Sequence, residues 1–253
     1  ISAEGGGHVV LGLSNKESFF KGLVSTDING ILDGATGQWG YNPGDVSMRL
    51  ANGATWEHKQ IGTGYHHKKE TGSKEKGISM DSRVTRLDAD KGILKQLDPH
   101  KLTIDNYSGN MRLVYEHIDD GTKAENYKAG DVHIKKAAAG SAVTMVTDSN
   151  GVALHDEAAV RKTLNALAGK LYYDGYVGGE RNLSGKATIA EGLTGSAKTL
   201  KVADMGWVAT GQGILQGTGS VSPGQPENPN PNPNPNTQIE YGDYETKLMS
   251  GVK

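Results

Sequence analysis

The sequence predicts an all-β fold made of short strands, and three observations lead to this class. Only 35% of the 253 residues are apolar, below the usual ~45–50%, so little bulky side-chain volume is available for a large compact core. Glycine contributes 36 residues, about twice the average usage of ~7%. Between Gly109 and Gly151, turn signals that contain glycine recur about every ten residues, a spacing typical of a β-sandwich, a β-barrel or a β-solenoid.

A parallel β-helix, or β-solenoid, explains two further features better than a sandwich or a barrel does. Each short solenoid strand needs only one or two inward apolar side chains, which suits the low apolar fraction. A solenoid also accepts uneven insertions between its levels. Residues 62–77 hold Gly, His, Lys and Glu with almost nothing apolar, and they predict a long solvated loop of this kind. The spacing alone does not choose among the three architectures.

Residues 1–82 are expected to form an irregular β region at the N-terminal end of the domain. A short apolar run occupies residues 9–13, and residues 46–50 alternate apolar and polar side chains as a half-buried strand does. An Asn-Gly turn signal at 52–53 then precedes a further extended piece. Residues 83–222 are expected to form the more regular part, with β-helix rungs and a cap.

Six strands are predicted between residues 83 and 150, separated by turn signals built on Asp, Asn and Gly. They cover residues 84–87, 92–97, 102–104, 111–115, 132–134 and 143–146. The alternation of apolar and polar positions along these strands predicts which side chains face the core. The predicted core residues are Leu102, Ile104, Met111, Leu113, Val132, Ile134, Val143 and Met145.

One short helix is predicted over residues 156–168, where it would cover a side or an end of the β structure. Asp156 and Glu157 supply the negative charge that the first turn of a helix favours. Gly169 is a stop signal. The apolar residues of its buried face, at helical spacing, are Val160, Leu164 and Leu167.

The C-terminal part of the sequence predicts a linker and a new element. Residues 223–237 contain six prolines, four of them in an Asn-Pro repeat, so we expect an extended spacer with some polyproline stiffness. Residues 238–253 place apolar and aromatic side chains at helical spacing, which predicts the start of a helix. Because the sequence starts at Ile1 and ends inside this stretch, it is interpreted as a fragment of a longer protein.

A domain followed by a stiff spacer and a new helix resembles the layout of a bacterial autotransporter, in which one chain carries a surface passenger and its own outer-membrane barrel. The resemblance covers residues 80–253. Residues 102–111 (LTIDNYSGNM) are similar to a strand–turn rung near the C-terminal end of such passengers, and residues 127–134 follow at a similar distance. Residues 176–194 are similar to a segment of large passengers from anaerobic Gram-negative bacteria, and residues 244–253 to the linker helix that leads into the barrel.

This resemblance implies a right-handed parallel β-helix passenger that is exported across two membranes and exposed at the bacterial cell surface. Its partners would be its own C-terminal outer-membrane β-barrel and a host or bacterial surface ligand that the sequence does not name. The lack of cysteine is typical of such passengers, because a disulfide would obstruct passage through the outer membrane. We expect a structural or adhesive stalk whose C-terminal rungs template the folding of the passenger during export.

The alternative is a β-helix polysaccharide depolymerase, either a lyase or a hydrolase of the tailspike kind. Such an enzyme needs an acidic groove, yet no pattern places two or three acidic residues on one face of successive strands. The motifs of serine hydrolases, zinc proteases and phosphate-binding loops are absent. We therefore expect no enzyme activity, catalytic residue or cofactor, and a secreted protease would need a catalytic domain upstream of Ile1.

Charge and hydropathy exclude two further classes. The net charge of −2 is unlike that of a nucleic-acid-binding protein, which relies on phosphate neutralisation. No run of about 18 apolar residues exists, so no membrane-spanning helix is expected. The absence of cysteine also excludes disulfide scaffolds and thiolate zinc sites.

Two groups of residues invite a metal-site interpretation that we consider weaker than the alternative. His58, His66 and His67 lie close in sequence, but adjacent residues of a strand point to opposite faces and the following lysines disfavour a dication. Residues 119–121 and 148–151 could each begin a calcium loop, but neither continues in the required register. We expect a solvated loop and two turns, and no metal site.

Tyr172, Tyr173 and Tyr176 form an aromatic cluster directly after the predicted helix. Such a cluster could bind a glycan or a protein partner. Packing between the helix and the β structure is the favoured interpretation, because two large side chains suffice to cover the end of a solenoid.

Overall fold

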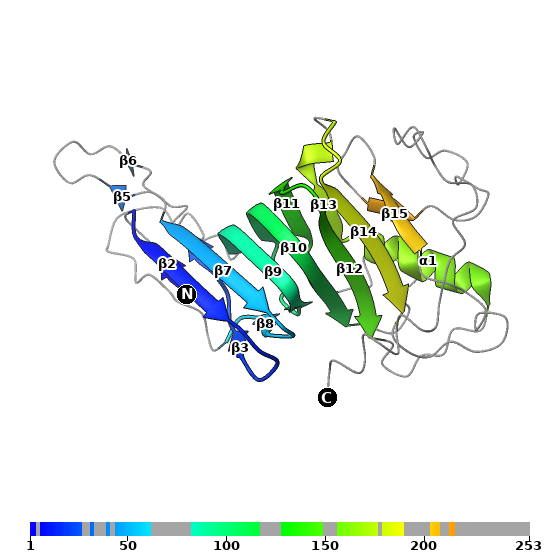
Figure 1. The fold of residues 1–253 in the computed structure, drawn as a ribbon, viewed down its shortest axis with the longest axis horizontal. Helices are drawn as coiled ribbons and strands as arrows, with labels where there is room; N and C mark the ends of the chain where they lie inside the picture. Colours follow the sequence, from blue (N-terminus) through cyan, green and yellow to red (C-terminus); the bar gives the residue numbers. More distant parts are fainter. Residues whose placement is uncertain are drawn as a thin grey trace, which may run out of the picture.

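The computed structural model describes residues 1–3, 6–26, 31–32, 39–40, 44–61, 82–116, 128–148, 156–176, 179–189, 203–207 and 213–215. The strands of this part lie side by side in a long row, and one α-helix lies near the C-terminal end of the row (Figure 1). The predicted loop at 62–77, the Asn-Pro spacer at 223–237 and the predicted helix start at 238–253 lie outside the described residues.

Strands account for nearly all of the regular structure. They are β1 (Ser2–Ala3), β2 (His8–Leu13), β3 (Phe19–Lys21), β4 (Ser25–Thr26), β5 (Ile31–Leu32), β6 (Trp39–Gly40), β7 (Asp45–Ala51), β8 (Thr55–His58), β9 (Ser82–Gln96), β10 (Leu102–Glu116), β11 (Val132–Ala137), β12 (Ser141–Asp148), β13 (Leu171–Tyr173), β14 (Leu183–Ile189), β15 (Ala203–Trp207) and β16 (Gly213–Leu215). The helices are α1 (Glu157–Ala168) and the short 3-10 helix η2 (Asp174–Tyr176).

Twelve of the described strands belong to one sheet, and its long path runs β16-β15-β14-β12-β10-β9-β7-β2. Every pairing from β2 to β14 along this path is parallel. The all-β class predicted from the sequence is therefore confirmed, and the structure shows it as one sheet of many mostly parallel strands. The finer prediction, a parallel β-helix, stays a prediction. β7 pairs with β9 across the predicted boundary between residues 1–82 and 83–222, so the two regions share one sheet.

Two short strands that follow one another in the chain pair with the two halves of one longer strand. The first half of β10 pairs with β11 and its second half with β12, while β9 pairs with β10 along almost its whole length. On the other side of β9, β7 and β8 cover its two halves in the same way, and β2 and β3 lie on β7 and β8. Each of the long strands β9 and β10 is therefore flanked by a pair of consecutive shorter strands. We call this series of paired strands the stack, and each long strand or pair of shorter strands a level.

The prediction that the turn signals at 90–92 and 108–110 separate strands is wrong. The structure runs β9 and β10 straight through them as two strands of 15 residues each. At these points the backbone adopts a positive φ at one residue, 58° at Lys91 and 90° at Gly109. One such residue bends a strand without reversing it, so the parallel pairing continues on both sides of the bend.

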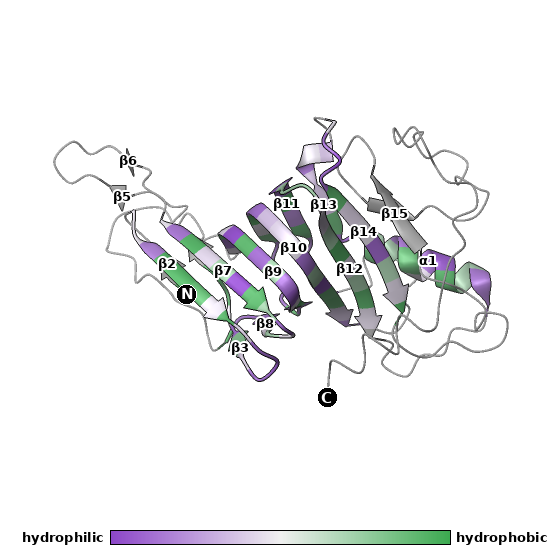
Figure 2. Ribbon diagram, in the orientation of Figure 1, coloured by the Kyte–Doolittle hydropathy of each residue, from purple (hydrophilic) through white to green (hydrophobic). Residues whose placement is uncertain are grey.

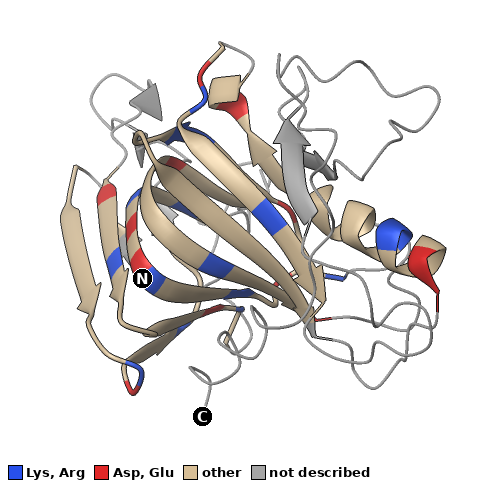
Figure 3. Ribbon diagram, turned by 45° about the vertical axis from the view of Figure 1, so that its right-hand side comes forward, with Lys and Arg blue, Asp and Glu red and all other residues tan. Residues whose placement is uncertain are grey.

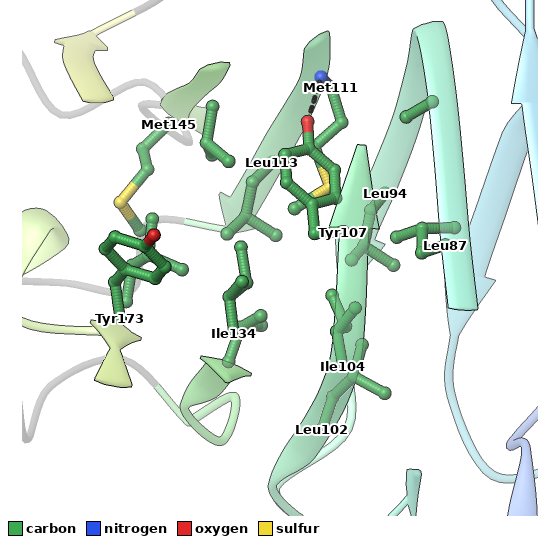
Figure 4. Packing of buried hydrophobic residues seen from close by; sticks show 14 of the residues in the cluster. Leu87, Leu94, Leu102, Ile104, Tyr107, Met111, Leu113, Ile134, Met145 and Tyr173 are labelled. Atoms are coloured by element: carbon green, nitrogen blue, oxygen red, sulfur yellow. Dashed lines mark hydrogen bonds between the residues drawn. The ribbon is translucent and has the colours of Figure 1, made fainter. Parts of the chain in front are cut away.

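The interior of the stack consists of apolar side chains from every level, and the alternation of hydropathy along the strands is visible in Figure 2. All eight predicted core residues are buried, with at most 2% of any side chain exposed. Figure 4 shows how those it labels, Leu102, Ile104, Met111, Leu113, Ile134 and Met145, point toward one another from neighbouring strands. Tyr107 is also buried in this core, and its hydroxyl forms two hydrogen bonds. It donates to Ala142 O at 2.6 Å and accepts from Met111 N at 2.8 Å.

The helix predicted at 156–168 is found at Glu157–Ala168. Asp156 caps it, accepting from Ala159 N at 2.8 Å, as an N-cap aspartate does. Val160, Leu164 and Leu167 are buried and join the main core. The helix lies beside β12, β14 and β16, and among the described residues no helix is long and apolar enough to cross a membrane.

We predict that replacing Gly109 by alanine destabilises the protein more than replacing Gly140. Both glycines have a positive φ, 90° and 78°, which costs a non-glycine residue about 1–3 kcal/mol. A Cβ on Gly109 would also lie 1.9 Å from Ala89 O, whereas nothing lies within 4 Å of one on Gly140. Urea unfolding of Gly109→Ala and Gly140→Ala measures the difference. Equal losses of unfolding free energy would show that the close approach at Gly109 is unimportant.

Candidate functional site

The outermost parallel strands, β2 and β3, form an open edge of the sheet. β2 pairs with β7 and β3 with β8, and within the described part of the chain neither has a strand on its other side. An unpaired edge presents a row of backbone N–H and C=O groups that can pair with another strand. The edge formed by β2 and β3 is the candidate functional site.

The core is also uncovered at this edge. Three inward side chains of β7 are buried with at most 2% exposed, namely Val46, Met48 and Leu50. Their partners in register on β2, one level further out, are only partly buried: Val9, Leu11 and Leu13. The same kinds of side chain in the same positions therefore differ in burial, because among the described strands β2 has a neighbour on one side alone. A further parallel level would complete their burial.

The opposite end of the parallel stack is built differently. β15 pairs with β14 in the antiparallel direction, and β16 pairs with β15 in the same way. The helix α1 lies beside β14 and β16 at this end (Figure 1). The parallel series thus ends in antiparallel strands on one side and in an open parallel edge on the other, which gives the stack a direction.

Outward side chains form charge ladders across three neighbouring strands. Glu57 on β8 lies between Lys21 on β3, at 3.2 Å, and Lys95 on β9, at 3.8 Å. Such ladders contribute only about 0–1 kcal/mol per pair, but a shifted register would bring like charges together. In the view of Figure 3, basic and acidic residues are accordingly mixed along the strands.

A second ladder crosses β9, β10 and β11. Arg83 on β9 contacts Asp105 on β10 through two nitrogens, at 2.7 and 2.8 Å, and Lys135 on β11 contacts the same carboxylate at 3.4 Å. Each ladder therefore places one carboxylate between two cations. The ladder that includes Lys21 ends at the open edge, with a cation on its outermost strand.

Behind this edge, a buried polar cluster ties the ends of β8 and β9 to the next turn. His58 is fully buried, and its Nδ1 bonds to the side-chain oxygen of Gln96. Gln96 Nε2 donates to His100 O at 3.1 Å and to Gly130 O at 3.2 Å. These two acceptors fix the amide orientation, so Nδ1 of His58 carries the proton and its Nε2, which has no hydrogen-bond partner, is unprotonated.

Asp98 is the second anchor of this cluster and is 2% exposed. Its carboxylate accepts from Gln60 N at 2.8 Å, from His100 N at 2.9 Å and from His100 Nδ1 at 2.5 Å. Burial opposes ionisation, but these hydrogen bonds outweigh it and lower the pKa of Asp98 below its usual value. Burial favours the neutral imidazole and lowers the pKa of His58.

The structure places the other sequence-predicted candidates as follows. Tyr173 and Tyr176 are buried in the main core, which supports the prediction that the tyrosine cluster packs against the helix and the strands. Tyr172 is half-buried, and its ring stacks on that of His133 with 4.5 Å between the ring centroids.

His58 packs edge-on against Trp56, with 5.5 Å between the ring centroids. In the described ranges no group of three or more His, Asp or Glu residues could hold a metal ion. His66 and His67, and the turns 119–121 and 149–151, lie outside the described residues.

Sequence reasoning missed both the open edge and the roles of Gln96 and Asp98. His58 and Gln96 are partners in register on β8 and β9 but lie far apart in the chain, so no local motif connects them. Comparison of the chain with family models, with curated proteins and with solved structures gives no match.

We predict that His58 makes the protein less stable in mild acid. Its folded pKa lies below the ordinary 6.5, so the unfolded state binds more protons and stability falls as the pH drops below that value. The lowered pKa of Asp98 acts in the same direction, but only nearer its ordinary value of 3.8. Urea unfolding at about pH 7.5 and about pH 5 separates the two groups.

The substitution His58→Gln keeps a donor for Gln96 but removes the titrating ring, so the difference in stability between the two pH values should shrink. His8→Gln, at an exposed histidine, is the control and should keep the wild-type difference. An undiminished difference in His58→Gln would contradict the assignment.

Proposed function

We propose that this chain belongs to the passenger of an autotransporter and forms a surface-exposed structural or adhesive stalk of a Gram-negative bacterium. The observation that carries the proposal is the direction of the stack, with an open parallel edge at β2 and antiparallel strands at β15 and β16. The similarity of residues 102–111 and 244–253 to passenger segments supports it. The proposal assigns no catalytic role to the chain.

The stacked strands, in this proposal, are rungs of a right-handed parallel β-helix. Support comes from the register: Leu102 lies opposite Ser82, 20 residues earlier, and opposite Val132, 30 residues later. The two intervals differ in length yet bring the chain back to the same position. A β-helix behaves in this way, because insertions leave the stack between levels while the paired strands keep their register.

The proposed role of the C-terminal rungs is to template folding during export. Each parallel level buries its apolar side chains only against its neighbours, so a new level gains burial only where one is already folded. The partly exposed Val9, Leu11 and Leu13 offer such a surface. Levels closer to the N-terminus would therefore be added one after another at the open edge, while the antiparallel end stays closed.

The proposal also includes the chain's own outer-membrane β-barrel as its partner, joined through the Asn-Pro spacer at 223–237. Export of a folding passenger through a barrel is driven in one direction if the emerging segment cannot return once folded. A stack that grows from its C-terminal rungs toward its N-terminal edge provides this directionality, because each completed level makes the preceding ones harder to unfold.

We predict that Leu113→Asp abolishes or strongly reduces surface display of the whole passenger. Leu113 is fully buried, and an unpaired carboxylate at this place costs several kcal/mol, so the rungs needed as a template do not form. Ser184→Asp introduces the same carboxylate at an exposed position of β14 and should leave display unchanged. Antibody labelling of intact cells that express the complete gene measures display, and normal labelling of Leu113→Asp would refute templating.

We predict a different result for Val10→Pro at the open edge. Gly7 O accepts from Asp45 N on β7, and successive peptide groups of a strand face opposite edges, so the N–H of Val10 faces away from β7. Proline at such a position is tolerated by an edge strand but blocks addition of a further strand. The isolated chain should stay folded, while the passenger segment ahead of it should remain sensitive to protease on the cell.

The matched control is Val9→Pro, which removes an N–H that faces β7 and should destabilise the isolated chain itself. Circular dichroism melts of both purified variants establish this contrast before the cell experiment. If the segment ahead of Val10→Pro becomes as resistant to protease as in the wild type, the open edge is not the site of growth.

A further inference from the structure

A depression of about 470 Å³ lies on the outer side of the stack, where β9, β10 and β11 bend. It is lined by Arg86, Asp88, Asn106, Tyr107, Ser108, Lys136, Ala137, Ala138, Glu180 and Asn182. Seven of these ten residues carry a charged, amide or hydroxyl group, and the others are Tyr107 and two alanines. The depression therefore suits a ligand with many polar groups, which can also rest on the aliphatic stems of these side chains.

Two cations line this depression, and they differ from Arg83 and Lys135, which form ion pairs with Asp105. Arg86 and Lys136 are exposed, and the side chain of neither has a hydrogen bond or ion pair to another residue that the structure describes. Arg83, three residues before Arg86 on β9, is held instead by Asp105. Both free cations lie opposite Asn106 in the register of β10 with its two neighbours. Two strand spacings, roughly 9–10 Å, separate their backbone positions.

The amides beside these cations are held in place and keep their oxygens available. Asn106 Nδ2 donates to Thr85 O at 3.0 Å, and Asn182 Nδ2 donates to Ala137 O at 3.1 Å. Each amide is thus anchored through its nitrogen, and its oxygen can accept a hydrogen bond from a ligand hydroxyl. Anchoring before binding reduces the entropy lost when a ligand orders these side chains.

The acidic groups of the depression are already engaged. Asp88 accepts from Ser108 Oγ at 3.0 Å and lies 3.9 Å from Arg49. Glu180 accepts from the hydroxyl of Tyr173 at 3.1 Å. Among the described residues the carboxylates therefore have partners while the side chains of the two cations do not, so a negative group on the ligand would be attracted to Arg86 and Lys136.

We propose that this depression binds an acidic saccharide, a linear sugar chain that carries carboxylates. Carboxylates of the saccharide would contact Arg86 and Lys136, and its hydroxyls would donate to the oxygens of Asn106 and Asn182. The distance between the cations favours an extended ligand with repeated charges over a single small anion. This assignment goes beyond the role in folding and does not depend on it, because the depression is formed within the chain alone.

The test measures binding of a hyaluronan oligosaccharide, which carries a carboxylate on every second sugar, to the purified full chain by isothermal titration calorimetry. The comparison ligand is the same oligosaccharide with its carboxylates reduced to alcohols. We expect the carboxylate form to bind at least about tenfold more tightly, and the affinity to fall with added salt. Absence of binding, or equal binding of the two forms, would overturn the proposal.

Arg86→Ala and Lys136→Ala should each weaken binding about tenfold, and the double variant further. Lys16→Ala removes an exposed cation from the loop between β2 and β3 and serves as the matched control with unchanged affinity. All three substitutions are at exposed positions, and unchanged thermal unfolding establishes that the variants are folded. Unaltered binding in the double variant would place the saccharide elsewhere. Because no step requires export, this result is independent of the display experiments.

Discussion

Parallel pairing with a fixed register between bends is the constraint on which the rest of this structure depends. Leu102 and Ile104 lie opposite Val132 and Ile134, which in turn lie opposite the residues of β13. Inward positions of one level must therefore meet inward positions of the next, since a shift by one residue would turn every apolar side chain outward. The core and the charge ladders keep this register along each straight part of the strands. At the bend a bulge shifts it by one residue, since Asn110 pairs with Asp90 but Arg112 pairs with Ile93.

At the bends, the close approach of neighbouring strands leaves no room for some side chains. At Gly109 the backbone of β10 approaches that of β9 so closely that only a hydrogen fits beside Ala89 O. Where the strands turn, carbonyl groups lose part of their ladder, and internal side chains replace it: Tyr115 donates to Gly130 O at 2.9 Å, and Gln96 donates to the same oxygen at 3.2 Å. Buried polar groups in this stack are thus positioned by the turns that they satisfy.

The sequence predicted composition-driven and local features well, and long-range ones poorly. Period-two alternation identified inward residues such as Leu113 and Met145, and helical spacing with an acidic first turn located α1 to within one residue. Alternation does not say which strand lies next to which. It therefore could not join the pieces of β9 across Asp90 and Gly92, pair His58 with Gln96, or reveal that β2 has an open side.

The register of β10 also relates the length of the stack to its number of levels. Ser82 and Leu102 occupy equivalent places one level apart, and neighbouring strands of a sheet are separated by about 4.8 Å. In the proposed β-helix, residues added between levels, as in the interval from Val132 to Leu171 that contains α1, leave the length of the stack unchanged. The length of such a protein would depend on its number of levels, so length and surface decoration could be changed separately.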